Sequence, residues 1–344
     1  MAAQKIINAI APTRICDVGG WTDTWFAKQG CILNIAVFPY VEVQIKVNRE
    51  RDTNERLVVN LENYGDSFNL NPKEIKYEKY PLIEAAIDSV NFPKDTCCEI
   101  NIFSLMPPGA STGTSGAITV ALIGALNSLT SEHLSVSEVA RLAHEVETVK
   151  LKKQSGIQDQ LCSAYGGISY IEMREYPYAS VSPLRLPSNI LWELERRLML
   201  VYIGTPHDSS AIHKKVIDKL GNDAENSPYM IALRNIARKA KEKLNDGNFD
   251  DFGECLNQNT QVQREMHPAL VCDQFENINE ICNDFNVLGC KVNGAGGDGG
   301  TMTVLTDGDM NKKRILASKL NEMGFKVIPV YLDNQGLRVW KSHN

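Results

Sequence analysis

The fold is decided by the stretch Pro107-Pro108-Gly109-Ala110-Ser111-Thr112-Gly113-Thr114-Ser115-Gly116-Ala117. It follows a short apolar run, and the apolar residues 117–126 predict a buried helix directly after it. Glycine and small hydroxyl residues allow a tight turn, and the first amide groups of a helix lack intrahelical acceptors. The stretch therefore predicts an anion site, with phosphate as the expected ligand, although a plain connecting loop has the same composition.

The bulk composition is that of a globular protein. The 344 residues are 43% hydrophobic and 23% charged, and this length favours two domains over one. A formal net charge of -6 gives no electrostatic reason to expect nucleic acid or an anionic membrane as a partner. No apolar run approaches the ~20 residues that span a bilayer, and residues 1–7 lack a signal-peptide core. We therefore expect a cytoplasmic protein without nucleic-acid or membrane partners, either a monomer or a homodimer.

The cysteines give no sign of a disulfide framework or of a zinc site. There are nine of them, scattered without C-x-x-C spacing. We expect most of them to be small buried side chains.

Strands and helices alternate along the predicted chain. The predicted strands cover residues 31–47, 55–61, 97–106, 168–173, 197–203, 287–293, 301–305, 326–331 and 337–340, and the predicted helices cover residues 81–90, 117–126, 135–150, 209–220, 228–245, 249–265, 272–285 and 310–323. A further helix is expected from a capping box at Ser155-Gln158 to Gly166-Gly167, and a similar box at Ser135-Glu138 begins the 135–150 helix. This order indicates an α+β fold, with a candidate domain boundary in the proline-containing segment 176–188.

An N-terminal stretch carries polar residues next to a backbone break. Residues 11–24 begin extended and break at Gly19-Gly20, which places Asp23 on a loop. Arg14 and Asp23 could hydrogen-bond sugar hydroxyls or a reacting oxygen. An Asx turn and a surface salt bridge explain the same residues without a ligand.

Two carboxylates follow the phosphate loop. Glu147 lies on a flank of small residues in the 135–150 helix, where it could approach a bound ion, although a solvated glutamate is the simpler alternative. Asp159 falls in the first turn of the next helix, where the helix dipole favours an ionised carboxylate. It could accept a proton from a hydroxyl nucleophile, but ordinary placement of charge in a first turn looks the same.

Two familiar nucleotide-binding motifs fail on their context. Residues 294–299 satisfy G-x-G-x-x-G, but a predicted strand follows them, whereas the dinucleotide fingerprint opens a helix. The 107–117 stretch lacks the Gly-Lys-Ser/Thr ending of a P-loop. A phosphate cradle here therefore depends on backbone N–H groups, a helix terminus and a metal.

Three stretches in the same order resemble the GHMP kinases, the superfamily of galactokinase, homoserine kinase, mevalonate kinase and phosphomevalonate kinase. They are residues 11–23, the phosphate loop 108–117, and Lys291-Val292-Asn293-Gly294-Ala295-Gly296-Gly297-Asp298-Gly299-Gly300. Residues 155–160 and 164–167 look most like the D-glycero-D-manno-heptose phosphate kinases, in the sugar-1-kinase branch. The resemblance implies an N-terminal α/β domain with a mixed sheet over residues 1–185 and a C-terminal ferredoxin-like α+β domain over residues 186–344, with the active site between them.

The resemblance also implies a set of site residues for ATP, Mg²⁺ and a sugar. Asp159 would be the catalytic base and Arg14 would lie beside the reacting oxygen, while Ser115 and Glu147 would hold magnesium. The nucleotide phosphates would be bound by Pro108, Gly109, Ala110, Ser111, Thr112, Gly113, Thr114 and Ser115, and the substrate by Gly20, Thr22, Asp23, Gly294, Gly296 and Gly297.

The implied reaction is transfer of the γ-phosphate of ATP to a sugar hydroxyl, with the anomeric hydroxyl of D-glycero-D-manno-heptose 7-phosphate or a related heptose as the first candidate. A kinase of an unphosphorylated galactose-, fucose- or arabinose-type sugar is the alternative, and a non-catalytic sugar and ATP sensor is the second. Two departures from the family pattern bear on this choice. Asp298 interrupts the glycine run, and His207 stands where heptose kinases tend to carry arginine.

Overall fold

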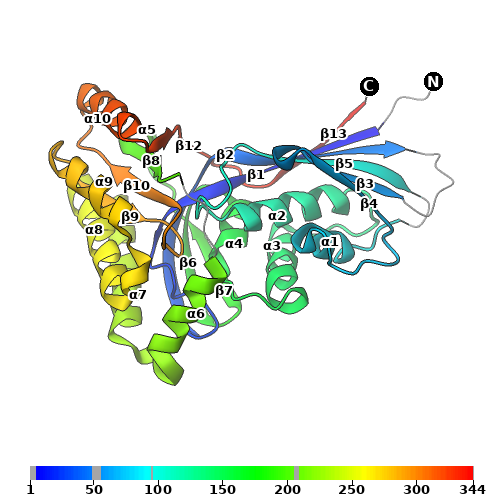
Figure 1. Ribbon diagram of the computed structural model, residues 1–344, viewed down its shortest axis with the longest axis horizontal. Helices are drawn as coiled ribbons and strands as arrows, with labels where there is room; N and C mark the ends of the chain where they lie inside the picture. Colours follow the sequence, from blue (N-terminus) through cyan, green and yellow to red (C-terminus); the bar gives the residue numbers. More distant parts are fainter. Residues whose placement is uncertain (1–4, 49–55, 94–95, 205–208, 344) are drawn as a thin grey trace.

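The computed structural model describes residues 5–48, 56–93, 96–204 and 209–343. Within these ranges the chain forms a nine-stranded sheet and a four-stranded sheet, with helices against both (Figure 1). The strands of the first sheet are β1 (Lys5–Val18), β2 (Gly30–Asn48), β3 (Leu57–Leu61), β4 (Asp66–Leu70), β5 (Cys97–Ser104), β6 (Ile168–Glu175), β7 (Tyr178–Pro183), β12 (Tyr331–Leu332) and β13 (Arg338–His343). Its helices are α1 (Pro81–Asp88), α2 (Thr114–Asn127), α3 (Val136–Glu145) and α4 (Gln158–Tyr165).

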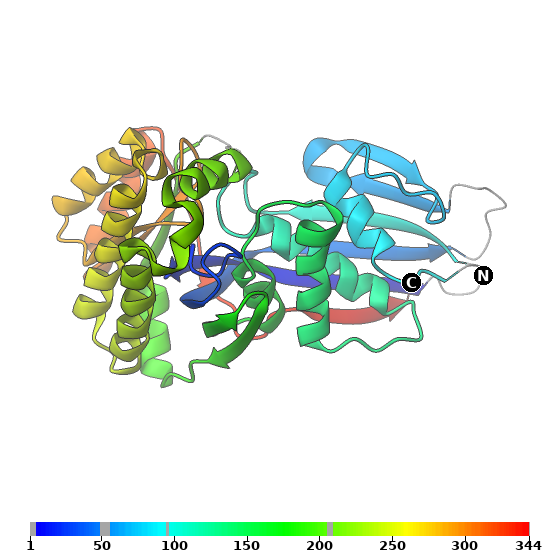
Figure 2. The same ribbon diagram turned by 90° about the horizontal axis from the view of Figure 1, so that it is seen from below.

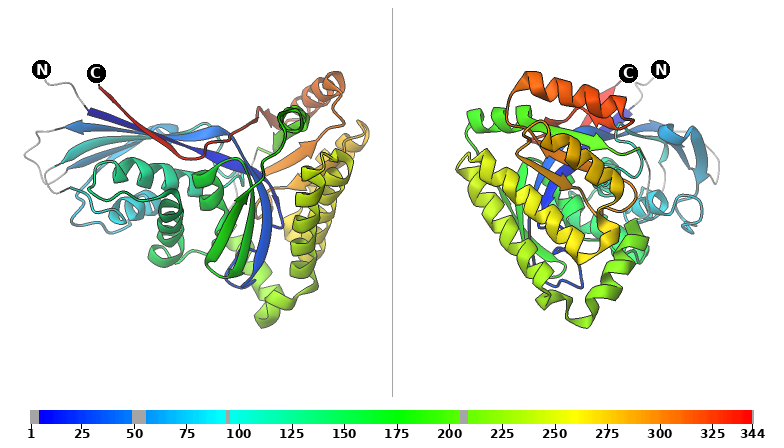
Figure 3. Two further views of the ribbon diagram at one scale, coloured as in Figure 1. Left: turned by 180° about the vertical axis from the view of Figure 1, so that it is seen from behind. Right: turned by 60° about the vertical axis from the view of Figure 1, so that its left-hand side comes forward.

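The first sheet is held together by one very long strand. Residues 30–35 of β2 pair with β6, whereas residues 41–48 pair with β5. The register between β1 and β2 shifts at Pro12/Thr13 and again between Ile15 and Val18, as expected where a sheet bends. Figure 3 shows both strands curving from the upper part of the sheet into the lower part. Because β3 and β5 pair in parallel among otherwise antiparallel strands, the sheet is mixed, as predicted.

The second sheet belongs to the C-terminal half. Its strands are β8 (Leu198–Tyr202), β9 (Gly289–Val292), β10 (Thr301–Leu305) and β11 (Lys326–Ile328), and the helices of this half are α5 (Ser188–Arg197), α6 (Ser209–Leu220), α7 (Pro228–Asn245), α8 (Phe249–Met266), α9 (Asp273–Asn283) and α10 (Met310–Glu322). The strand order β11-β8-β10-β9 and the chain order strand, helices, two strands, helix, strand give the ferredoxin-like arrangement. The predicted α+β fold class is confirmed.

Strand β8 separates two apolar cores. Leu198 and Leu200 on one face pack in a core with residues 15–18 of β1, residues 31–37 of β2, and helices α7 and α8. Met199 and Val201 on the other face pack with α9 and α10. A third core fills the space between the part of the first sheet formed by β3, β5 and the ends of β1 and β2 next to them, and helices α1 to α3, which Figure 2 shows in front of these strands. Period-two alternation therefore places opposite faces of one strand in different cores.

The division of the chain at residue 185 stays a prediction. One core contains Ile15 and Tyr170 from before this point together with Phe252 and Leu305 from after it. In addition, β12 and β13 return from the C-terminal half and pair with β2 and β1 of the first sheet. The predicted boundary segment 176–188 is itself structured over six residues, because β7 pairs with β6.

Most predicted elements form within a few residues of their expected limits, and one predicted helix changes type along its length. The Ser135–Glu138 capping box is confirmed, but the helix it begins changes to a π-helix, η2, over Val146–Lys150. Eight of the nine cysteines are buried and one is partly buried, and none forms a disulfide. No helix in the described part of the chain is long and apolar enough to cross a membrane.

A buried glutamate anchors the start of α1. The carboxylate of Glu84 accepts hydrogen bonds from the backbone N–H groups of Glu78, Lys79 and Tyr80, at 3.2, 2.8 and 2.6 Å. We expect Glu84→Ala to lower the free energy of unfolding by about 1–3 kcal/mol, because it leaves backbone donors without acceptors. Urea unfolding measures this loss. The same loss in the exposed control Glu74→Ala, or an unchanged free energy in Glu84→Ala, would contradict it.

Candidate active site

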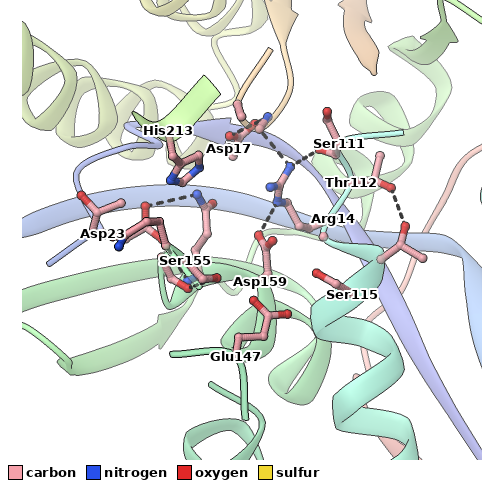
Figure 4. Close-up of a pocket in the computed structure, with 18 of the residues that line it drawn as sticks. Arg14, Asp17, Asp23, Ser111, Thr112, Ser115, Glu147, Ser155, Asp159 and His213 are labelled. Carbon is pink, nitrogen blue, oxygen red and sulfur yellow. Dashed lines mark hydrogen bonds and ion pairs between the residues drawn. The ribbon is translucent and has the colours of Figure 1, made fainter. Parts of the chain in front are cut away.

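A cavity of about 340 Å³ opens where the two halves of the chain meet. Its walls come from β1 and the turn after it, the loop before α2, the segment from η2 into α4, α6, and the turn after β9. The lining residues include Arg14, Asp17, Trp21, Asp23, Thr24, Gly109, Ala110, Ser111, Thr112, Gly113, Thr114, Ser115, Glu147, Lys153, Gln154, Ser155, Gly156, Gln158, Asp159, His213, Gly294 and Ala295. Residues far apart in the sequence therefore share one cavity, as Figure 4 shows.

The predicted phosphate loop forms one wall of this cavity. Gly109, Ser111 and Gly113 all have positive φ angles, of 69°, 57° and 68°. Gly113 is the N-cap of α2 and provides no side chain to cap it. The loop thus winds tightly around the beginning of a helix whose first amide groups have no side-chain cap. Its geometry is that of an anion cradle, with Ser115 exposed at its end.

Arg14 and Asp159 form an ion pair beside this loop. Arg14 Nε donates to Asp159 Oδ1 at 2.8 Å, and Arg14 NH1 donates to the Ser111 carbonyl at 2.6 Å. Burial alone lowers the pKa of Arg14, but the carboxylates of Asp159 and Asp17 more than offset this, so the pKa is raised. The arginine is therefore a fixed cation, and it orients one oxygen of Asp159.

Glu147 lies on the side of Asp159 away from Arg14, near Ser115 (Figure 4). It belongs to the π-helix η2, and π-bulges are frequent at functional sites. The side chain is buried, and its Oε1 has no hydrogen-bond partner. Burial raises the pKa of Glu147, while the Ser155 and Ser115 hydroxyls oppose that rise. A buried carboxylate oxygen without a partner, facing a cavity, is suited to a cation.

Asp23 caps the helix that carries Asp159. Its Oδ2 accepts from the backbone N–H of Gln158 at 3.1 Å, and its Oδ1 accepts from the Gln158 side-chain amide at 3.4 Å. The predicted capping box at Ser155-Gln158 is therefore wrong. The N-cap is Ile157, without a side-chain cap of its own, and the Ser155 hydroxyl donates to the Gly156 carbonyl instead. A carboxylate from the N-terminal stretch has taken the place of the local cap.

Asp23 gives the structure a pH dependence with a definite sign. Burial raises its pKa to about 6, from an ordinary value of 3.8. The folded state therefore holds this proton more tightly than the unfolded chain, and the stability gained below pH 3.8 is lost as the pH rises through 6, by on the order of 3 kcal/mol. We expect Asp23→Asn to lack this loss, so that unfolding free energies of the two proteins diverge between pH 4 and pH 7. Parallel curves over this range would contradict the assignment.

Several residues predicted at the substrate side do not reach the cavity. Thr22 is fully buried and donates to the Gly19 carbonyl at 2.7 Å. Gly20 lies against Asp17, and the N–H groups of Gly296 and Gly297 donate to the carbonyls of Asn293 and Leu270. These residues shape the turns on which Asp23 and Gly294 are carried. Pro108 also lies outside the cavity lining, and its carbonyl accepts from Tyr202.

The two departures from the family pattern have different outcomes. Asp298 is exposed and is not among the described residues that line the cavity, so its charge lies in solvent. His207 lies outside the residues that the structure describes.

Sequence reasoning missed other parts of the cavity wall. Trp21 packs against His213 on α6, with ring centroids 4.6 Å apart, and its indole N–H is buried without a partner. Gln158 has a buried carbonyl oxygen that is also unpartnered. Asp17 forms an ion pair with the fully buried Lys291. Asp17, Trp21, Gln158 and Lys291 lie within stretches that carry the family resemblance, but the sequence assigned no role to any of them.

The residues present fit a nucleotide and a divalent cation. The loop around Gly113 offers backbone N–H groups in the arrangement that binds phosphate. Magnesium prefers one or two carboxylates and takes its other oxygens from phosphate and water. Glu147, with an unpartnered oxygen, and the exposed Ser115 match this pattern. No group of three or more acidic, histidine or cysteine side chains suited to a metal occurs in the described ranges, so a closed protein cage is absent there.

Comparison with known proteins agrees with this fold. Residues 81–167 match the family described as GHMP kinases N terminal domain. The chain is 25% identical to the D-glycero-alpha-D-manno-heptose 7-phosphate kinase of Campylobacter jejuni, over 98% of this chain and 100% of that protein. It is 28% identical to the mevalonate kinase of Pyrococcus abyssi, over 72% of this chain and 70% of that protein. The crystal structure of a D-glycero-D-manno-heptose 1-phosphate kinase from Bacteriodes thetaiotaomicron shares the fold, with a TM-score of 0.78 at 20% identity over 98% of this chain and 100% of that one.

The matched domain, the shared fold and the full-length similarity agree on the class: this chain is a kinase that transfers a phosphoryl group to an alcohol. Its matched domain is that of the GHMP kinases, and its similarities are consistent with the sugar-kinase branch of that superfamily. Kinases of this superfamily use ATP, so ATP is its phosphoryl donor.

Proposed function

We propose that the chain phosphorylates the anomeric hydroxyl of a sugar, with D-glycero-D-manno-heptose 7-phosphate or a related heptose as the first candidate. The observation that carries this proposal is the Arg14–Asp159 pair at 2.8 Å, beside both the phosphate loop and the polar wall formed by Asp23 and Gln158. The full-length similarity to a heptose 7-phosphate kinase supports the choice of sugar.

Asp159 is proposed to accept the proton of the attacking hydroxyl, with Arg14 holding the carboxylate in place. Residues 109–115 would bind the phosphates of ATP through backbone N–H groups and the start of α2. Glu147 and Ser115 would hold Mg²⁺, which supplies neutralisation of charge on the phosphate oxygens. Because phosphoryl transfer asks a protein mainly for positioning and charge neutralisation, these groups are sufficient for the reaction.

The cationic residues of the cavity favour a second candidate, a kinase of an unphosphorylated sugar. Among the described lining residues, the arginine is Arg14 and the lysine is Lys153. Arg14 is engaged by Asp159 and Ser111, which leaves Lys153 to meet a phosphate carried by the substrate. Phosphate groups are usually bound by several charged donors. A neutral sugar fits such a cavity with fewer cations.

A substrate screen separates these candidates. ATP consumption is measured with heptose 7-phosphate, free heptose, fucose, galactose, arabinose and mevalonate, each with and without the protein. We expect turnover with a heptose and none with mevalonate. The proposed function would be contradicted if mevalonate were the one compound phosphorylated, or if none of the tested compounds were phosphorylated.

Glu147→Gln tests the proposed metal site. The amide keeps the shape of the side chain but removes its charge, so we expect the Mg²⁺ concentration at half-maximal activity to rise by about tenfold or more. Glu145→Gln is the matched control, because Glu145 lies two residues earlier and pairs with Arg141 at the surface. An unchanged magnesium titration in Glu147→Gln would remove this residue from the metal site.

A further inference from the structure

A second ion pair, between Asp17 in β1 and Lys291 in β9, lies next to Arg14. Lys291 is fully buried, and its Nζ lies 3.3 Å from Asp17 Oδ1. It also donates to the Val292 carbonyl at 2.5 Å. Burial lowers the pKa of Lys291, and the Asp17 carboxylate opposes this. Since an unpaired buried ammonium is very costly, Asp17 is what allows a cation at this position.

Asp17 also holds the turn that faces the phosphate loop. Both of its oxygens accept from the Gly294 N–H, at 3.2 and 3.0 Å. Gly294 has a φ of 60°, and a Cβ there would lie 2.9 Å from the Ser111 carbonyl oxygen. The C-terminal glycine turn therefore rests against the phosphate loop, and Asp17 fixes its backbone at the point of contact.

Arg14 stands between this ion pair and Asp159. Its NH1 lies 3.8 Å from Asp17 Oδ1 and donates to the Ser111 carbonyl, while its Nε is bonded to Asp159 (Figure 4). One end of the guanidinium is thus held by Asp17 and Ser111, and the other end holds Asp159. A displacement of either support changes the position that Arg14 imposes on Asp159.

We propose that Asp17 is a positioning residue for phosphoryl transfer, and that Lys291 balances its charge. Asp17 keeps Arg14 and the Gly294 turn in register with Asp159, whereas Lys291 contributes stability alone. This assignment rests on the proposed roles of Arg14 and Asp159.

The test uses the full-length chain with Asp17→Asn, Lys291→Met and the double variant, and measures Tm, kcat and the KM for ATP with the sugar found in the screen. Asp17→Asn leaves the buried Lys291 without its carboxylate, and Lys291→Met leaves Asp17 with Arg14, 3.8 Å away, as its remaining counter-charge, so we expect each change to lower Tm by about 5 °C or more. The double variant removes both charges, and its Tm should return most of the way to that of the wild type. Asp307→Asn and Lys312→Met, alone and together, remove a surface pair 2.9 Å apart and serve as the control.

We expect the order of these variants by kcat to differ from their order by Tm. We expect kcat about tenfold lower or more in both variants that lack Asp17, including the stable double variant, with the KM for ATP changed by less than about threefold. Lys291→Met should lose less turnover than the double variant despite its lower Tm. If kcat recovers with Tm in the double variant, or if the double variant is less stable than both single ones, the proposal is overturned.

Asp159→Asn is assayed in parallel to separate two kinds of failure. An inactive Asp159→Asn protein beside a fully active double variant overturns the role of Asp17 and leaves the proposed function standing. A wild-type protein that phosphorylates no sugar, or an Asp159→Asn protein with full turnover, overturns the proposed function, and the assignment of Asp17 falls with it.

Discussion

Replacement of Asp159 by asparagine is expected to lower kcat by about 10²-fold or more while ATP binding is largely retained. The amide oxygen can still accept from Arg14 Nε, which is 2.8 Å from the carboxylate. The substitution therefore removes the negative charge and the basic oxygen and keeps the shape of the site. ATP contacts are assigned to the loop before α2, so they should survive.

Steady-state kinetics and calorimetric titration with ATP measure the two halves of this expectation. Asp250→Asn is a suitable control, because Asp250 is an exposed aspartate in the first turn of α8, as Asp159 is in the first turn of α4. Tm is recorded for both, since Asp159→Asn also leaves the buried Arg14 with a weaker partner. Full turnover in a folded Asp159→Asn protein would show that another group takes the proton.

Gly113→Ala should have the second large effect, on kcat/KM. Gly113 has a φ of 68°, and a Cβ at this position would lie 2.9 Å from Asp159 Cγ and 3.2 Å from Arg14 Cγ. The added methyl group therefore displaces the ion pair and the loop together. Because a misplacement of about 1 Å in a reacting group can cost about 10²-fold, we expect a loss of that order in kcat/KM.

Gly65→Ala separates the steric effect from backbone strain. Gly65 has a nearly equal φ of 59°, but nothing lies within 4 Å of its Cβ position. Both substitutions carry the cost of a left-handed alanine, about 1–2 kcal/mol of stability, and Gly113→Ala alone adds the contact with the site. Equal losses of kcat/KM in the two variants would contradict a direct role for the Gly113 turn.

The sequence was informative where the physical signal is local. The turn at Gly113 follows from residues that are close neighbours along the chain. The continuous apolar run of strand β8 and the Ser135 capping box are local in the same sense. Such features need only backbone geometry and neighbouring side chains, and the structure agrees with them.

Contacts between distant segments could not be derived from spacing. Arg14 and Asp159 are 145 residues apart, and Asp23 and Gln158 are 135 apart. The incorrect capping box at Ser155 has this origin: residues 155–158 fit the local pattern, but Asp23, in the turn after β1, accepts from the Gln158 N–H instead. The sequence likewise did not identify Lys291 as the ion-pair partner of Asp17, because a lone lysine in a strand is usually at the surface.

The sequence also did not establish that the Glu147 side chain is buried. A glutamate near the end of an amphipathic helix is normally solvated, although Glu147 lies four residues after the buried Ala143 and so shares its face. The change to a π-helix over Val146–Lys150 alters the direction of the side chains there. Glu147, the second residue of this π-helix, is buried beside the cavity.

Phosphorus NMR of the product tests the central claim most directly. The protein is incubated with ATP, Mg²⁺ and the accepted sugar, and the coupling of the new phosphate signal to sugar protons identifies the phosphorylated carbon. The proposed function predicts ADP and a sugar phosphate ester at the anomeric carbon, formed by Asp159→Asn about 10²-fold or more slowly than by the wild-type protein. A phosphate ester at another position, or ADP and inorganic phosphate without any ester, would contradict it.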